Sequence, residues 1–234
     1  VVKVPVRADF SFDVEAVARC GAAIFFLTNP NAPLGVSFPP AKVAELARAF
    51  PGLLVVDEAY AAFADADCAE LPKTHANVVV TRTFSKGHAL AGLRAGYALC
   101  PPGLATVLHR VRDSYNLDRL AQFAAAAALA DGAWLRETVG KVRAERTRLT
   151  RGLEALGWTV VPSSGNFILA TPVSVRRPAS PATGEHAFAF LRERKILVRR
   201  FPNHPLTASA LRITVGTPAE MDAFLAAARA WSEG

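Results

Sequence analysis

Two segments in the first half of the chain place reactive side chains just after expected strands. Asp57-Glu58-Ala59-Tyr60 follows the apolar run Leu53–Val56, and Thr83-Phe84-Ser85-Lys86 follows the run Asn77–Thr81. Ligands of open α/β sheets bind at the carboxyl ends of the strands. We therefore expect a carboxylate, a phenol, hydroxyls and a lysine amine at one edge of a sheet.

Two further segments belong with these. Ala91-Gly92-Leu93-Arg94 adds a guanidinium shortly after the lysine, and the turn-forming segment Asn29-Pro30-Asn31-Ala32-Pro33-Leu34-Gly35 follows another apolar run, Ala23–Leu27. Together, the four segments supply what a cofactor with one aldehyde, one basic ring nitrogen and one phosphate requires.

Each group of such a cofactor has a matching side chain. An aldehyde needs a lysine amine for a Schiff base, and a ring nitrogen needs a carboxylate that keeps it protonated, so that the ring accepts electrons. A phosphate needs hydroxyl donors and an arginine. The matching residues are Lys86 for the aldehyde, Asp57 for the ring nitrogen, Tyr60 for the ring hydroxyl, and Thr83, Ser85 and Arg94 for the phosphate.

Each residue alone has an ordinary structural explanation. Asp57 is also a typical helix cap, Ser85-Lys86 a typical surface dipeptide, and Arg94 a typical salt-bridge partner. Their order and spacing in combination favour the cofactor site.

The chain resembles the fold-type-I aminotransferases that use pyridoxal 5'-phosphate, and most closely the histidinol-phosphate aminotransferase branch. The resemblance covers nearly the whole chain. The matching segments are Asn29–Gly35, Asp57–Tyr60 followed by Phe63, Arg82–Lys86, Leu90–Tyr97, Ser163–Leu169, Ile196–Arg199 and Leu211–Thr217.

The resemblance implies a role for each matched residue. Lys86 would bind the cofactor covalently and shuttle a proton, while Arg212 would receive the substrate carboxylate and Arg199 the distal phosphate of the substrate. Asn166 would line the substrate side. For Arg199 and Arg212, surface strand arginines are the alternative. No catalytic role falls on any histidine: His75, His88, His109, His186 and His204.

The implied activity is transfer of an amino group between a phosphorylated amino alcohol, such as histidinol phosphate, and 2-oxoglutarate, in histidine biosynthesis, by a homodimer. One alternative is a decarboxylase similar to threonine-phosphate decarboxylase, which shares the scaffold. The fold does not decide between them, because the bond held perpendicular to the cofactor ring is the one that breaks. The other alternative is a degenerate homologue that acts through protein contacts.

The chain departs from the family pattern in two ways. Ala32 stands where the family has an asparagine that hydrogen-bonds the cofactor, and Leu34 where it has a threonine. Family members also carry about a further third of chain before the point that matches Val1–Val6, which resembles the middle of a domain. We expect an N-terminal third to be missing from this sequence.

Alternating strands and helices predict an α/β fold of the PLP-transferase type I, with a mainly parallel sheet sandwiched by helices and a smaller α+β C-terminal domain. We expect a cofactor-binding large domain over residues 1–132, and a long linking helix with the small domain over 133–234.

Expected helices cover Pro40–Phe50, a segment after Pro102, the mostly buried Leu117–Leu129, Ala133–Leu156, Glu185–Arg194 and Pro218–Trp231. Besides the runs named above, expected strands cover Ala95–Leu99, Trp158–Val161, Phe167–Ala170, Ile196–Val198 and Leu211–Val215, and Ser174–Thr183 is expected to be a loop.

The composition argues against a nucleic-acid-binding protein, a disulfide-rich or metal-binding protein, and a membrane-spanning protein. The net charge is +7, but the arginines Arg143, Arg146, Arg148 and Arg151 alternate with glutamates, as on the solvated face of a helix. We therefore expect no nucleic-acid partner. The three scattered cysteines predict neither a disulfide framework nor a metal site, and no apolar run is long enough for a bilayer. The expected location is the cytoplasm.

Overall fold

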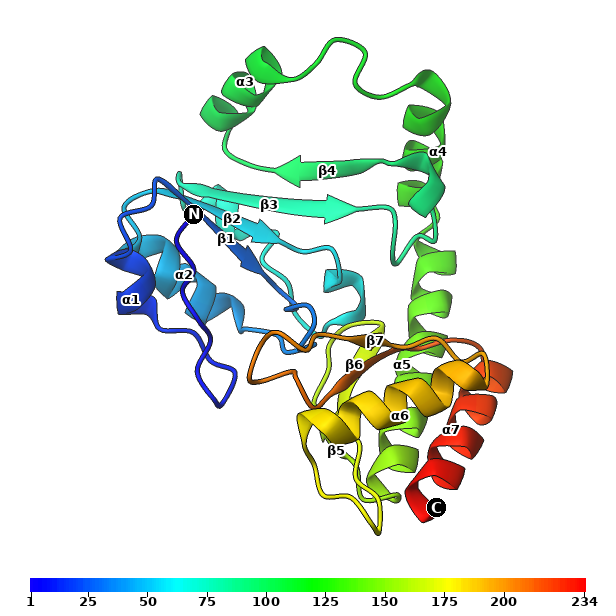
Figure 1. The fold of residues 1–234 in the computed structure, drawn as a ribbon. Helices are drawn as coiled ribbons and strands as arrows, with labels where there is room; N and C mark the ends of the chain where they lie inside the picture. Colours follow the sequence, from blue (N-terminus) through cyan, green and yellow to red (C-terminus); the bar gives the residue numbers. More distant parts are fainter. The chain divides into compact units, whose positions relative to one another are not determined.

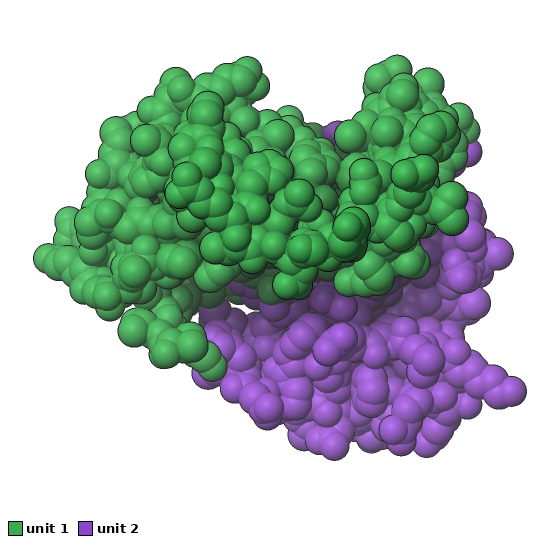
Figure 2. All heavy atoms as spheres, turned by 90° about the horizontal axis from the view of Figure 1, so that it is seen from above, with its two compact units in different colours: residues 1–32, 37–138 green, residues 33–36, 139–234 purple.

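The computed structural model describes residues 1–234. The chain divides into two compact units, coloured separately in Figure 2. Unit 1 comprises Val1–Ala32 and Ser37–Thr138, and unit 2 comprises Pro33–Val36 and Val139–Gly234. The domain division at residue 132 that the sequence indicates stays a prediction.

Unit 1 contains a four-stranded sheet with strands in chain order (Figure 1). The strands are β1 (Ile24–Thr28), β2 (Leu53–Asp57), β3 (Val78–Thr83) and β4 (Gly96–Leu99). β1, β2 and β3 run parallel, and β4 pairs antiparallel with β3. Thr28 pairs with Asp57, which pairs with Thr81, so the carboxyl ends of the three parallel strands meet at one edge. The expected fold class is confirmed.

Four helices belong to unit 1: α1 (Val14–Ala18), α2 (Pro40–Ala49), α3 (Pro102–Val111) and α4 (Arg119–Ala130). Short 3-10 turns follow β2, precede β3 and precede β4, over Ala61–Phe63, Leu71–Lys73 and Ala91–Leu93. The Asn77 side chain donates to the carbonyls of Ala47, Phe50 and Gly52, which fixes the turn between α2 and β2. Phe50 packs against Phe25 of β1, so the end of α2 covers that face of the strand. On the opposite face, Phe26 is 69% exposed.

The expectation that Leu117–Leu129 forms a helix is met, but the expectation that this helix is mostly buried is wrong. The helix forms, but Leu120 is 80% and Phe123 79% exposed. Only one face of α4 is covered, where Ala125 packs with Phe84 and Ala95. A helix that is apolar on all sides needs neighbours on all sides, and unit 1 provides them on one.

Unit 2 combines an antiparallel sheet with three helices. Its strands lie in the order β5 (Thr159–Val161), β6 (Phe167–Thr171), β8 (Leu211–Thr214) and β7 (Arg199–Arg200). Its helices are α5 (Gly132–Glu154), whose first residues belong to unit 1, α6 (Pro181–Glu193) and α7 (Pro218–Glu233). The largest core side chains include Leu149, Leu153, Trp158, Ile168, Phe224 and Trp231.

Two expected boundaries in unit 2 are wrong. Residues Ile196–Val198 do not pair in the sheet, and β7 begins at Arg199. The left-handed backbone of Lys195, with φ at 61°, redirects the chain before this segment, and Leu197 is left 82% exposed. Helix α6 begins at Pro181 and not at the expected Glu185, so the end of the expected loop Ser174–Thr183 is helical. The helix starts there because the Ser180 side chain caps it by accepting from the Thr183 amide.

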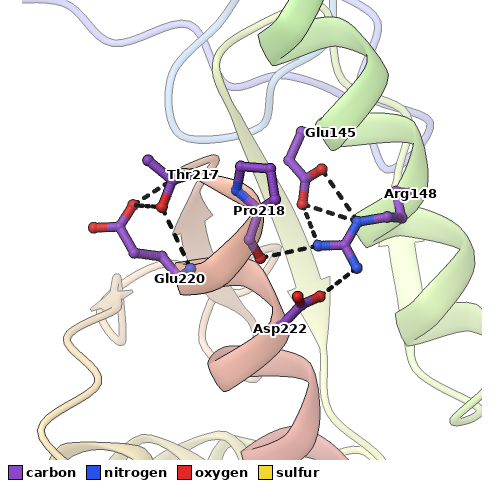
Figure 3. A network of polar contacts seen from close by, with 6 residues as sticks. All are labelled: Glu145, Arg148, Thr217, Pro218, Glu220 and Asp222. Atoms are coloured by element: carbon purple, nitrogen blue, oxygen red, sulfur yellow. Dashed lines mark hydrogen bonds and ion pairs between the residues drawn. The ribbon is translucent and has the colours of Figure 1, made fainter.

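The charged face of α5 makes specific contacts with α7 (Figure 3). Arg148 binds Glu145 on its own helix and Asp222 at 2.6 Å, and it donates to the Pro218 carbonyl. The first turn of α7 is closed by a capping box, in which Thr217 and Glu220 each bind the backbone amide of the other. None of the helices has both the length and the apolar composition that a bilayer span requires.

Candidate active site

Asp57 lies at the end of β2 and at the centre of the carboxyl edge. Its Oδ1 accepts a hydrogen bond from the Ala59 amide at 3.0 Å, which turns the chain away from the sheet and fixes the carboxylate. The side chain is half-buried. It does not cap a regular helix, but it forms a turn with the amide two residues on.

The lysine loop begins where β3 ends. The Ser85 amide donates to Thr83 Oγ1 at 3.1 Å, and the two hydroxyls are 2.9 Å apart. Phe84, between them, is buried against Tyr97 and bonded through its backbone to Ala95. Because Phe84 anchors the loop, the flanking hydroxyls and the exposed Lys86 lie on its open side.

Arg94 ends the 3-10 turn that leads into β4. Its backbone is left-handed, with φ at 52°, a conformation that costs a non-glycine residue about 1 kcal/mol. Two residues later, Gly96 pairs with Thr83, and a Cβ on Gly96 would lie 2.6 Å from the Arg82 carbonyl oxygen. The glycine therefore lets β4 approach β3 and brings the Arg94 turn to the carboxyl edge.

These residues line one open cavity of about 380 Å³ in unit 1. It combines a carboxylate, an amine, guanidinium groups and hydroxyls, which is the donor set that a phosphorylated pyridine aldehyde requires. Tyr60 lies beside it, with its ring centroid 5.6 Å from Lys86 Nζ. The lining residues are Asp57, Ala59, Thr81, Arg82, Thr83, Ser85, Lys86, Ala91 and Arg94. The individual roles given to them stay predictions.

The three expected substrate residues lie in unit 2. Arg199 on β7 and Arg212 on β8 are direct cross-strand partners. The Arg212 guanidinium lies 5.1 Å from the Phe167 ring centroid and 5.3 Å from that of Phe201. The sheet thus brings the two arginines together on aromatic support. Asn166 precedes β6, where its carbonyl accepts from the Val215 amide.

The turn segment Asn29–Gly35 has a structural role that the sequence did not reveal. The Asn29 side chain is buried and bonds both the amide and the carbonyl of Phe38, which closes the loop. Gly35 has a φ of 88°, and a Cβ there would collide with Ser163. Leu34, which replaces the family threonine, is buried.

Glu58 is a buried charged residue for which the sequence predicts no role. It is 2% exposed and forms an ion pair with Arg82 at 2.7 Å. Burial raises the pKa of the Glu58 carboxyl, against the opposing effects of the Cys68 amide and Arg82. Its position directly after an apolar run can be seen in the sequence. Its pairing with Arg82 cannot, because Arg82 lies on another strand.

Comparisons with known proteins agree on one family. The family model for class I and II aminotransferases matches residues 1–227. The chain is 51% identical over 199 residues to a histidinol-phosphate aminotransferase of Geotalea daltonii, covering 85% of this chain and 55% of that protein. It is 45% identical over 225 residues to one of Citrifermentans bemidjiense, covering 96% and 62%.

A solved structure has a similar fold. The histidinol-phosphate aminotransferase of Sinorhizobium meliloti, solved in complex with pyridoxal-5'-phosphate, has a TM-score of 0.86 and 34% identity, covering 98% of this chain and 64% of that one. The chain thus spans less than two thirds of the length of each of these relatives.

Proposed function

Since the chain belongs to the class I and II aminotransferase family, we propose that the protein is a pyridoxal-phosphate-dependent transaminase acting on histidinol phosphate and 2-oxoglutarate. The cavity that gathers Asp57, Thr83, Ser85, Lys86 and Arg94 is the observation that carries this proposal. The identity of 51% to a histidinol-phosphate aminotransferase supports the choice of substrate.

Pyridoxal phosphate, when bound, supplies a ring that accepts the electrons of the substrate α-carbon. The side chains of this cavity bind and orient it. Thr83, Ser85 and Arg94 hold the phosphate with hydroxyl and guanidinium donors. The Asp57 carboxylate, whose orientation is fixed by the Ala59 amide, would keep the ring nitrogen protonated.

Lys86 and Tyr60 complete the cavity. The Lys86 amine would hold the cofactor covalently at Nζ and, once released as a free amine, would move a proton between the substrate α-carbon and the cofactor. The Tyr60 ring lies beside that nitrogen, and its hydroxyl would donate to the ring oxygen of the cofactor. Thr83 and Ser85 keep the loop that carries Lys86 in place.

The arginines of unit 2 favour an anionic substrate. Arg212 would bind the carboxylate of 2-oxoglutarate, and Arg199 the phosphate of histidinol phosphate, each in the forked geometry of a guanidinium. As direct cross-strand partners, the two residues project from the same face of the sheet. Asn166 would line the substrate side.

We further propose a cytoplasmic homodimer with the domain division given above. Exposed apolar side chains of unit 1 support a large apolar contact with a second copy. They are Val107, Leu108 and Val111 on α3, Tyr115 between the helices, and Leu120, Phe123 and Leu129 on α4. The free state of Cys20, Cys68 and Cys100 agrees with a reducing compartment.

A donor assay tests the proposed function. The full-length protein, loaded with pyridoxal phosphate, should form glutamate from 2-oxoglutarate when histidinol phosphate is the donor, and the Lys86→Ala variant should not. Release of CO2 from threonine phosphate without glutamate formation would instead identify the decarboxylase. Absence of both reactions in protein that binds the cofactor would favour the non-catalytic alternative.

A further inference from the structure

Glu58 lies behind the wall of the candidate cofactor cavity, directly after Asp57. Its side chain is fully buried, and one oxygen, Oε2, accepts from both Nε and Nη2 of Arg82 at 2.9 and 2.7 Å. The other oxygen, Oε1, accepts from the Cys68 amide. A forked ion pair removed from water is among the stronger polar contacts in proteins.

The pair joins the ends of two strands that carry cavity residues. The Glu58 amide donates to the Thr81 carbonyl on β3, and Arg82 lies between Thr81 and Thr83 in the chain. Arg82 itself lines the cavity. Arg82 therefore connects Glu58 to the place where the cofactor would bind.

Arg82 also has a second carboxylate partner. Asp67 lies 3.0 Å from Arg82 Nη2, but its side chain is 43% exposed, whereas that of Glu58 is fully buried. A buried charge acts through a lower dielectric than an exposed one, so Glu58 contributes more to the potential at the cavity. With both carboxylates ionised, the trio of Glu58, Asp67 and Arg82 carries one net negative charge.

Other ionisable groups surround this pair. On the cavity side they are Asp57, Tyr60, Lys86 and Arg94, and on the side of Glu58 they are Cys68, His88 and Tyr97. The cavity wall carries the basic side chains of Lys86 and Arg94 and one carboxylate, Asp57, so the charge of Arg82 adds to the basic side of this balance unless further carboxylates offset it.

We propose that Glu58 is a positioning residue for the transaminase reaction, which offsets the charge of Arg82 at the cavity wall and fixes the ends of β2 and β3. The inference rests on the proposed function. Glu58 does not line the candidate cofactor cavity and would act through Arg82, which does.

The test compares single and double charge changes in the cofactor-loaded full-length protein. The measured quantity is the midpoint of the pH titration of the cofactor absorbance, which reports the proton on the nitrogen that joins Lys86 to the cofactor. Glu58→Gln removes one negative charge and keeps the shape, so the midpoint should move to lower pH by about one unit. Arg82→Gln should move it to higher pH.

The double variant distinguishes an electrostatic role of Glu58 from a purely structural one. Glu58→Gln with Arg82→Gln restores the net charge of the trio, so its midpoint should return towards that of the wild type even if its thermal stability does not. Glu70→Gln, the same change in an exposed pair with Lys73, is the matched control and should leave the midpoint in place.

If Glu58→Gln does not fold, Asp67→Asn removes the exposed partner of the same arginine and should move the midpoint in the same direction, by less. Lower thermal stability with an unmoved midpoint in the variants would overturn the inference and leave Glu58 a structural residue. Failure of the wild-type protein to bind the cofactor at Lys86 would instead overturn the proposed function.

Discussion

The thiol of Cys68 shows how burial controls a single side chain near the site. Burial raises its pKa from 9.0 to about 12, and the negative charge of Glu58 adds to this effect. The unfolded chain therefore releases this proton at lower pH than the folded one. The free energy of unfolding should fall as pH rises from about 9 towards 12, because the unfolded state binds fewer protons there.

Urea unfolding at pH 8 and pH 10 checks this prediction. The wild-type protein should lose about 1 kcal/mol more between the two pH values than Cys68→Ala, which has no thiol to ionise. Cys100→Ala, at a half-buried cysteine, is the matched control and should behave as the wild type. Equal losses in wild type and Cys68→Ala would show that the thiol is not protected by burial.

Ala32 is the residue at which the family pattern and this chain differ most. If position 32 faces the cofactor, Ala32→Asn adds a donor to the ring oxygen and favours its deprotonated form. The absorbance titration should then move to lower pH, and cofactor affinity should rise severalfold, in line with about 1 kcal/mol for one hydrogen bond. An unchanged titration and affinity would show that residue 32 does not face the cofactor.

Among the elements, α7 owes its start to the capping box formed by Thr217 and Glu220. Thr217→Ala leaves amides of the first turn without their side-chain acceptor, so it should lower the free energy of unfolding by about 1 kcal/mol. Thr147→Ala, at an exposed position within α5, is the control and should be neutral or slightly stabilising, since alanine favours helices. Thermal unfolding of both variants measures the difference. Equal effects would contradict the capping role.

The elements that the sequence predicted correctly are those with a strong local signal. Pro40 begins α2, the continuous apolar runs form β1 to β3, and Gly157 with a φ of 80° follows the long helix. Ile196–Val198 has the same apolar composition as a strand. Its exclusion from the sheet depends on the backbone of Lys195, which composition does not encode.

The candidate site was predictable to the extent that its residues are close in sequence. Thr83 ends β3, Ser85 and Lys86 follow it in one loop, and Asp57 ends the neighbouring strand β2. The pairing of Glu58 with Arg82 depends on the register of β2 and β3, so it becomes visible only in the folded chain. The exposure of α4 likewise depends on what packs beside it.

For the whole molecule, the exposed apolar side chains of α4 predict self-association. Sedimentation of the full-length protein should show a homodimer, and Phe123→Glu should weaken it by placing a charge in the contact. Val175→Glu changes an apolar residue of unit 2 that is also highly exposed, and it is the matched control. A strictly monomeric wild-type protein with normal turnover would contradict the dimer.

In the proposed function, Lys86 holds pyridoxal phosphate in the cavity formed with Asp57 and Arg94. Borohydride reduction of the cofactor-loaded full-length protein, followed by peptide mass spectrometry, tests this attachment. The reduced cofactor should be attached to Lys86 alone, and Lys86→Ala should take up no label. Attachment to Lys42, Lys73 or another lysine in the wild-type protein would contradict the proposed role of Lys86.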